Sequence, residues 1–293
     1  MTLIQIIETM SARLESAGVC FGHGTSNAFD EAAWLVLWQL KLPLDALDQF
    51  AERALSADEQ QAIEALVEQR IQTRRPAAYL TGEAWLQGVP FTVDERVIVP
   101  RSLIAEVLAD GTIDAWLSDR TQAVLDLCTG NGSLAVLAAM AWPEVTVDAA
   151  DLSADALAVA HVNVERHDLA ARITIYQGDG LAAVAGRRYD LILCNPPYVN
   201  RTSMAALPAE YRAEPVLALD GGDDGMDFIR TLLHDAPAAM TDDDAVLVLE
   251  IGHERAHFEH AFPTLEPVWL PTSAGDDQVL LLTRAALAPL KKP

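Results

Sequence analysis

The tetrapeptide Asn195-Pro196-Pro197-Tyr198 follows a strand-like run over residues 189–194, and its residue types could bind a planar amine. Proline fixes φ and has no N–H, so two prolines predict a stiff corner where that strand ends. There the side-chain carbonyl of Asn195 and the backbone carbonyl of Pro196 can face one point, and two acceptors suit the two donors of an –NH2 group. Tyr198 can pack flat against whatever carries the amine. The alternative interpretation is an ordinary proline-rich turn after a strand, so neighbouring motifs must decide.

A glycine-containing stretch upstream, residues 126–133, lies where a predicted strand meets a predicted helix. Gly130 and Gly132 permit a tight turn and let a ligand approach the backbone closely. Ligands of open α/β sheets bind at the carboxyl ends of strands, so the location suits a binding site. Taken alone, such a turn is also compatible with simple packing or with a dinucleotide site. The candidate cofactor-binding residues within it are Asp126, Cys128, Thr129, Gly130, Asn131 and Gly132.

Acidic residues end the next two predicted strands. Asp151 lies about 20 residues beyond the glycine turn, where a carboxylate can accept both ribose hydroxyls. Asp179-Gly180 ends the third strand, where an acid can accept from an adenine amino group, and Asn195 ends the fourth. Four successive strand ends therefore deliver polar groups to one edge of the sheet. This series predicts a site for an adenosyl cofactor without a pyrophosphate, because no Gly-x-x-x-x-Gly-Lys-Ser/Thr motif is present.

In combination, these motifs resemble the class I S-adenosylmethionine-dependent methyltransferases. More closely, the chain is similar to the protein glutamine methyltransferases that modify release factors and a ribosomal protein. Asn-Pro-Pro-Tyr alone is shared with adenine methyltransferases of DNA and RNA, but the flanking segments also follow the glutamine methyltransferase pattern. These segments are residues 74–82, 91–101, 207–215 and 221–225.

Two departures from the release-factor pattern indicate a branch. Cys128 replaces the usual first glycine of the cofactor turn, and Pro100-Arg101 continues as Ser102-Leu103-Ile104-Ala105-Glu106. Both features resemble the branch that acts on large-subunit ribosomal protein L-three. Leu103 departs from that branch, which commonly has a proline there. We interpret Cys128 as a tolerated small residue and not as a nucleophile, because no histidine lies near it in the sequence.

The resemblance implies a seven-stranded Rossmann-like sheet, S-adenosylmethionine as cofactor and a glutamine side-chain amide of ribosomal protein L-three as substrate. It also implies a catalytic group made of Asn195, Pro196, Pro197 and Tyr198, with Asn195 close to the cofactor as well. Three alternatives remain open at this point. They are the Gly-Gly-Gln glutamine of release factors, an adenine amino group of nucleic acid, and a non-catalytic assembly factor that kept the fold.

The predicted helices and strands around these residues divide the chain into three parts. Residues 1–80 have apolar residues at helical spacing and predict a small helical bundle that docks the substrate, with one helix starting at Asp30-Glu31. Residues 81–100 predict a hairpin linker, with β-prone runs at 85–87 and 90–99. Residues 101–293 form the predicted methyltransferase domain, and 289–293 a frayed tail.

Apolar strands alternate with helical segments in the third part, which predicts an α/β fold with a doubly wound, mostly parallel sheet. We expect helices at 133–141, 154–167 and 226–239. The strands are expected at residues 123–127, 145–150, 173–177, 191–194, 245–251 and 278–283.

Composition narrows the class of protein and of partner. The 293 residues include 43 acidic and 20 basic ones, a formal charge of −23, which repels nucleic acid and favours a basic protein partner. No apolar run approaches the roughly 18 residues needed to span a bilayer. Three widely spaced cysteines match neither a disulfide nor a metal-ligand pattern, so a reduced, cytoplasmic protein without a metal site is expected.

Overall fold

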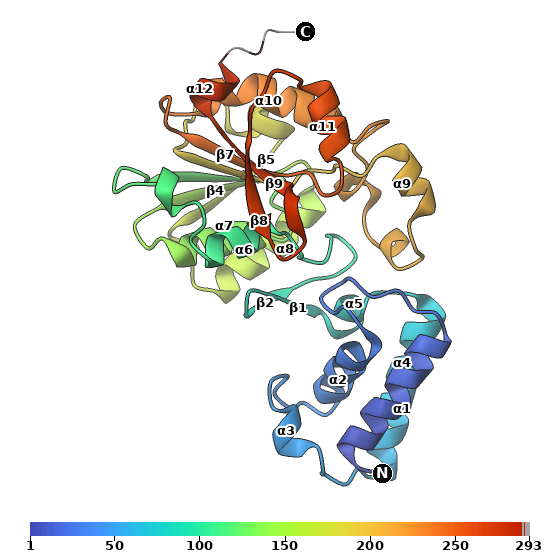
Figure 1. Cartoon of the computed structure of the whole chain (residues 1–293). Coiled ribbons are helices and arrows are strands. Elements are labelled where there is room, and N and C mark those ends of the chain that lie inside the picture. Colours follow the sequence, from blue (N-terminus) through green and yellow to red (C-terminus); the bar gives the residue numbers. More distant parts are fainter. Residues whose placement is uncertain (289, 291–293) are drawn as a thin grey trace.

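The computed structural model describes residues 1–288 and 290, and it consists of a helical N-terminal part and a sheet-containing C-terminal part. Figure 1 shows the two parts stacked, with a short hairpin between them. The longer helices are α1 (Leu3–Ser16), α2 (Ala28–Gln39), α4 (Ala57–Thr73), α7 (Ser133–Ala141), α8 (Ala154–Arg166) and α10 (Asp227–Ala239). Shorter ones are α3 (Leu47–Phe50), α5 (Ala77–Thr81), α6 (Ile104–Ala109), α9 (Arg201–Ala206), α11 (Arg255–Ala261) and α12 (Arg284–Leu287).

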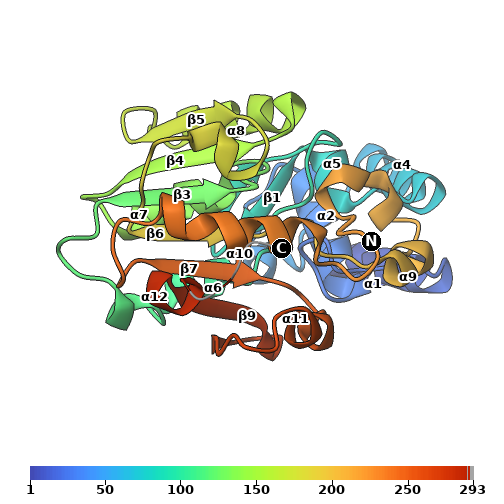
Figure 2. The ribbon, with the colours of Figure 1, turned by 90° about the horizontal axis from the view of Figure 1, so that it is seen from above.

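A seven-stranded sheet forms the centre of the C-terminal part, in the order β5-β4-β3-β6-β7-β9-β8. The strands are β3 (Ala123–Leu127), β4 (Thr146–Asp151), β5 (Ile173–Gln177), β6 (Leu191–Cys194), β7 (Val246–Glu250), β8 (Val268–Thr272) and β9 (Gly275–Thr283). The first five strands pair in parallel, and β9 is antiparallel to β7 and β8. Figure 2 shows the order from β5 to β9 across the sheet. The predicted fold class, including the seven strands, is confirmed.

The two faces of the sheet bury alternate residues of the same strands. Val124 packs with α6, α7 and α8 on one face, whereas Leu125 packs with α10, α11 and α12 on the other. Strands buried on both faces are nearly continuous apolar runs, which is why the sequence pattern located them well. The chain reverses direction across the sheet between β3 and β6, and this neighbouring pair is the usual place for a ligand site.

The N-terminal part packs α1, α2 and α4 around a shared apolar core. Ser56 caps α4 with a reciprocal capping box, in which Glu59 N–H donates to Ser56 and Ser56 N–H donates to Glu59. The expected start of the second helix at Asp30-Glu31 is wrong. That helix begins at Ala28, because the side chain of Asn27 accepts the N–H of Asp30 and so provides the cap.

The hairpin between the two parts consists of β1 (Glu83–Leu86) and β2 (Val89–Thr92). Gln87 and Gly88 both have positive φ, as a two-residue hairpin turn requires. The predicted extension of the second strand to residue 99 is wrong. Val93 N–H still donates to the carbonyl of Gly82, but Val99 N–H donates to the side chain of Glu214, so the linker leaves the ladder.

Strand β8 was not predicted. Its run contains Pro271, and a proline usually argues against a strand, but β8 lies at the edge of the sheet, where one missing donor is tolerated. The expected frayed tail at 289–293 falls mostly on residues 289 and 291–293, outside the described part of the chain. Within the described residues, no helix is long and apolar enough to cross a membrane, and no group of three or more potential metal-ligating side chains occurs.

Candidate functional site

A pocket opens at the carboxyl ends of β3, β4, β5 and β6. Of the predicted site residues, Cys128, Gly130, Asp151, Asp179, Gly180, Asn195 and Pro197 line it. The structure therefore brings together one residue set from four strand ends, as the sequence series predicted. Asp126, Thr129, Asn131, Gly132, Pro196 and Tyr198 are not among the residues that line the pocket, and the first four belong to the 126–133 stretch.

The glycine turn has an unusual backbone at its first position. Cys128 has φ of 60°, in the left-handed region that favours glycine, and Gly130 and Gly132 follow with φ of 55° and 81°. A Cβ in this conformation is strained by about 1–2 kcal/mol, so a glycine would be accommodated more easily at this position. The Cys128 side chain faces the pocket.

Asp126 holds the turn from below. Its Oδ2 accepts the hydroxyl of Thr129 at 2.5 Å and the N–H of Ala135 at 2.9 Å, so it ties β3 to the first turn of α7. Its Oδ1 is buried and has no partner among the described residues. Burial raises the pKa of Asp126 to about 7, against the opposing effect of these two hydrogen bonds.

Asp151 closes the turn from the side. Its Oδ2 accepts the N–H of Gly130 and its Oδ1 accepts the N–H of Ser153, both at 2.9 Å. Burial raises the pKa of Asp151, although its backbone hydrogen bonds act in the opposite direction. Each carboxylate oxygen has a second lone pair, so Asp151 can still accept from a ligand. Asp179 is exposed at the pocket edge, after β5.

Asn195 follows the last residue of β6 and lines the same pocket as Asp151 and Asp179. Tyr198, expected to pack against the carrier of the amine, does not line this pocket, and its hydroxyl donates to Oε1 of Glu250 at 3.1 Å. Its ring lies against Gly252, where a Cβ would come within 2.5 Å of the ring. Burial, followed by the Glu250 carboxylate, raises the pKa of Tyr198 well above its ordinary value.

Glu250 was not predicted as a site residue. It ends β7 and is buried, and its Oε2 accepts the hydroxyl of Ser102 at 2.6 Å and the N–H of Leu103 at 2.8 Å. Burial raises the pKa of Glu250, because its hydrogen-bond donors are neutral. This carboxylate joins Tyr198 to the start of α6. Its position at a strand end was the only signal in the sequence that could have indicated it.

The second missed group surrounds Arg101. Its guanidinium forms a bidentate pair with Glu214, at 2.6 and 2.7 Å, and its Cζ lies 5.3 Å from the ring centroid of Tyr211. Burial opposes ionisation of Glu214, but Arg101 and His23 hold its pKa at about 2. Glu214 lies in a segment similar to the glutamine methyltransferases, and that segment similarity could have indicated it.

The pocket suits an adenosyl cofactor. Asp151 and Asp179, expected to accept from ribose and adenine, both line the pocket. Leu152 and Phe228 add apolar surface to the same pocket. Leu152 is 49% exposed, so part of its apolar surface is accessible at this pocket. Donor and acceptor types therefore match the predicted ligand.

Comparisons with known proteins show which family the chain resembles. Residues 107–210 match the family model described as methyltransferase small domain, and residues 5–82 match the PrmC N-terminal domain. The chain is 54% identical over 288 residues to the ribosomal protein uL3 glutamine methyltransferase of Bordetella pertussis, covering 98% of this chain and 96% of that protein. The enzyme with the same description from Burkholderia pseudomallei is 52% identical over 295 residues, covering 98% and 95%.

The chain belongs to the uL3 glutamine methyltransferase family. The branch predicted from Cys128 and the Ser102–Glu106 stretch is thereby confirmed, as is the enzyme class. A solved structure with the same fold is the catalytic domain of hMettl16 in complex with MAT2A 3′UTR hairpin 6. It has a TM-score of 0.53 and 12% identity, and the match covers 81% of this chain and 85% of that one. At that identity the similarity concerns the fold alone.

Proposed function

We propose that this protein transfers a methyl group from S-adenosylmethionine to the side-chain amide nitrogen of a glutamine in ribosomal protein uL3. The observation that carries the proposal is the position of Asn195, which lines one pocket together with Asp151 and Asp179. An amide acceptor next to a cofactor-type site is what methylation of a planar –NH2 group needs. The relatives at 54% and 52% identity bear the corresponding name.

Residues of the strand ends would hold the cofactor. Asp151 accepts from the ribose hydroxyls and Asp179 accepts from the adenine amino group. The turn of Cys128 to Gly132 borders the rest of the cofactor. Asp126, Thr129 and Asn131 act indirectly, because they fix the shape of that turn. Bound there, the cofactor supplies a methyl group already activated by its sulfonium.

The corner at Asn195 binds and orients the substrate amide. An amide nitrogen is a poor nucleophile, because its lone pair is delocalised into the carbonyl; the rotation barrier of about 18–20 kcal/mol reflects that delocalisation. Asn195 and the Pro196 carbonyl accept the two N–H donors and so direct the lone pair toward the pocket, and Pro197 keeps the corner rigid. Tyr198 supports the corner, while Glu250 holds the tyrosine hydroxyl. Positioning of this kind can lower a barrier by about 7–11 kcal/mol.

The substrate is proposed to be a basic protein that meets an acidic enzyme. The formal charge of −23 favours association with a basic partner and disfavours direct binding of nucleic acid. Residues 1–80 are proposed as the docking domain, 81–100 as the linker and 101–293 as the methyltransferase domain. Three free cysteines suit a reducing compartment, and we place the enzyme in the cytoplasm.

The test is methyl transfer in vitro. Purified protein, S-adenosylmethionine and either uL3 or a release factor are incubated, and the modified glutamine is located by mass spectrometry. We expect one methylated glutamine in uL3 and at least about a hundredfold slower reaction in Asn195→Ala, since removal of one aligned polar group in a catalytic site costs this much. Asn27→Ala, which removes only a distant helix cap, is the matched control.

Each alternative substrate has its own outcome. Methylation of the release factor and not of uL3 would replace the proposed substrate while keeping the reaction. Methylation of neither, together with no binding of S-adenosylmethionine in calorimetry, would leave a non-catalytic assembly factor. Unchanged turnover in Asn195→Ala would refute the role of that residue.

A further inference from the structure

The loop of residues 207–219 forms part of the pocket wall, because Pro215, Leu217 and Ala218 line the pocket. The loop is closed at its base. The N–H of Val199 donates to the carbonyl of Leu219 at 2.9 Å, and the N–H of Gly221 donates to the carbonyl of Val199 at 2.9 Å. Val199 directly follows the candidate catalytic tetrapeptide. Contacts that fix the position of this loop therefore also fix one border of the proposed substrate site.

Apolar packing alone holds this loop poorly. Val216 and Leu217 at its tip are 61% and 55% exposed, although Leu219 is buried. Segments with few buried apolar contacts open locally at low free energy unless polar contacts hold them. Two buried glutamates of the loop, Glu210 and Glu214, supply such contacts.

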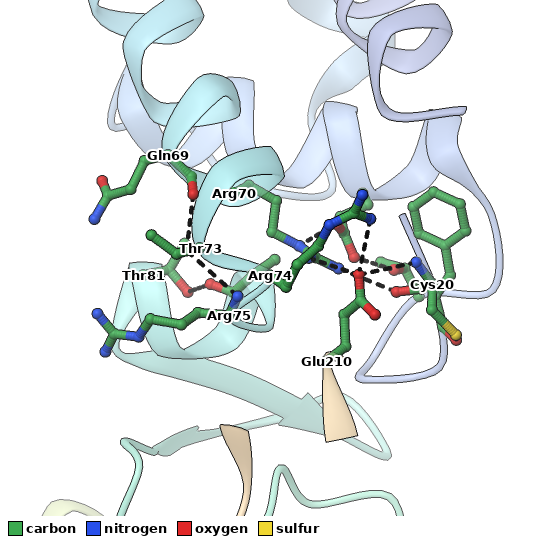
Figure 3. Close-up of polar contacts among 12 residues, drawn as sticks. Cys20, Gln69, Arg70, Thr73, Arg74, Arg75, Thr81 and Glu210 are labelled. Atoms are coloured by element: carbon green, nitrogen blue, oxygen red, sulfur yellow. Dashed lines mark hydrogen bonds and ion pairs between the residues drawn. The ribbon is translucent and has the colours of Figure 1, made fainter. Parts of the chain in front are cut away.

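Glu210 binds the N-terminal helical part. Its Oε1 accepts the N–H of Cys20 at 3.1 Å and lies 3.4 Å from a guanidinium nitrogen of Arg70 and of Arg74. Figure 3 shows Glu210 extending from the loop into this group. Arg70 is fully buried at the end of α4, where Glu31 at 2.8 Å and the carbonyl of Cys20 at 3.0 Å also hold it.

Glu214 contacts both the linker and the N-terminal part. Besides its bidentate pair with Arg101, its Oε1 accepts the N–H of Val99 at 2.9 Å, and its Oε2 lies 3.4 Å from Nε2 of the buried His23. The ring of Tyr211 lies between the two glutamates in sequence and packs on His23, with centroids 4.3 Å apart. The loop is therefore attached to the N-terminal part and to the linker at once.

Buried ion pairs of this kind are costly, because the desolvation of two charges offsets most of their attraction. Apolar residues of similar volume could fill the same space at equal or lower cost. What the ion pairs add is a defined arrangement, since a bidentate arginine pair constrains both distance and angle. This reasoning favours a role in placing the loop over a role in stability alone.

We propose that Glu210 and Glu214 are positioning residues, which clamp the 207–219 loop to the N-terminal part so that residues 215–218 form the substrate-side wall of the pocket. The inference rests on the proposed methyl transfer to a protein glutamine and adds a role for the helical part. That part contributes the anchor of one wall of the active site, besides any docking surface.

Glu210→Ala tests the clamp. Arg70 keeps Glu31 as its partner in this variant, so the helical part retains a paired arginine. Glu68→Ala is the matched control, because Glu68 also pairs with an arginine of the helical part, Arg13, but is exposed and far from the loop in sequence. Three quantities are measured on the full-length proteins: kcat and KM for uL3, the affinity for S-adenosylmethionine, and the rate of tryptic cleavage after Arg212.

Arg212 is an exposed residue between the two glutamates, so its cleavage rate reports on loop opening without any catalysis. In Glu210→Ala we expect about tenfold faster cleavage and about a tenfold higher KM for uL3, with kcat changed much less. Cofactor affinity should stay within about threefold, because Asp151 and Asp179 lie outside the loop. Glu68→Ala should match the wild type in all three.

Two results would overturn the proposal. Unchanged cleavage would show that Glu210 does not hold the loop, and faster cleavage with unchanged KM and kcat would show that loop position does not matter for the substrate. A wild-type protein that methylates no uL3 would count against the proposed function instead, and the cleavage rate would still decide whether the clamp exists. If Glu210→Ala does not fold, Glu210→Gln removes only the charge and is expected to act in the same direction.

Discussion

The carboxylates of β3 and β7 and those that clamp the 207–219 loop are buried alike but have different partners. Asp126 and Glu250 accept hydrogen bonds from hydroxyl and backbone N–H groups, whereas Glu210 and Glu214 face arginines. Burial accordingly raises the pKa of the first two. The pKa of Glu214 falls to about 2 and that of Glu210 is also lowered, although burial opposes both changes.

This difference separates two uses of a buried acid. Neutral donors orient a carboxylate without compensating its charge, so Asp126 and Glu250 shape the turn and the tyrosine at an electrostatic cost to the folded state. Arginine partners compensate the charge and add a constrained geometry, so Glu210 and Glu214 join segments that are distant in sequence. The first pair of acids thus shapes the surroundings of the ligand pocket, whereas the second pair fixes the position of the loop.

The largest expected effect comes from breaking an arginine pair. Arg101→Met leaves the fully buried Glu214 carboxylate without its bidentate partner, and we expect a loss of about 3 kcal/mol or more in the free energy of unfolding. Urea denaturation measures it. Arg13→Met breaks an exposed pair with Glu68 and should cost less than about 1 kcal/mol. Equal losses in the two variants would contradict the comparison.

The two groups should also give opposite pH dependence. The pKa of Asp126 is raised from 3.8 to about 7 by folding, so its contribution to stability is present at low pH and is lost as pH rises from about 4 through 7. The pKa of Glu214 is lowered from 4.5 to about 2, so its contribution is present above about 4.5 and is lost as pH falls toward 2.

Unfolding free energies of Asp126→Asn and Glu214→Gln, measured from pH 3 to 8 against the wild type, separate the two slopes. Asp126→Asn should remove a loss of roughly 4 kcal/mol between about pH 4 and 7, and Glu214→Gln should remove a loss of roughly 2 kcal/mol between about pH 4.5 and 3. If both differences in unfolding free energy changed with pH in the same direction, the hydrogen-bond and arginine partners would not determine the pKa values of the two carboxyl groups.

A smaller effect is expected for Asp151, an acid that holds the turn and also faces the ligand. Asp151→Asn keeps an acceptor for Gly130 N–H, removes the charge and turns its –NH2 toward Ser153 N–H, so the affinity for S-adenosylmethionine should fall at least about tenfold. Calorimetry measures the affinity. Asp155→Asn, an exposed acid in the first turn of α8, is the control. Affinity unchanged in Asp151→Asn would exclude the ribose role.

The smallest effect is expected for Glu250→Gln. In this variant the amide oxygen can accept from Ser102 and Leu103 while the amide –NH2 donates to the hydroxyl oxygen of Tyr198, so the stability change should be below about 1 kcal/mol. Glu214→Gln should cost clearly more at neutral pH. Thermal unfolding of both variants gives the comparison directly, and a larger loss for Glu250→Gln would reverse the assignment of roles.

The apolar pattern predicted the regular elements where one physical signal dominates. Helix α7 and strands β5 and β6 have the predicted bounds, because buried elements in a parallel sheet consist of long apolar runs with glycine or polar ends. The pattern failed where a local contact competes. Asn27 moved the start of α2, Glu214 drew Val99 out of the hairpin ladder, and edge position allowed Pro271 in β8.

The amino-acid sequence was sufficient to predict the strand ends at Asp151, Asp179 and Asn195, which line the pocket. Its motifs were also sufficient to predict the family. These signals are local, since each is a few residues at the end of a predictable strand. The contacts of Glu250 and Glu210 could be known only once the chain was folded. Their partners Ser102 and Arg70 lie 148 and 140 residues away in the chain. A buried charge is tolerated only beside such partners, and no short-range pattern records which distant residues folding brings together.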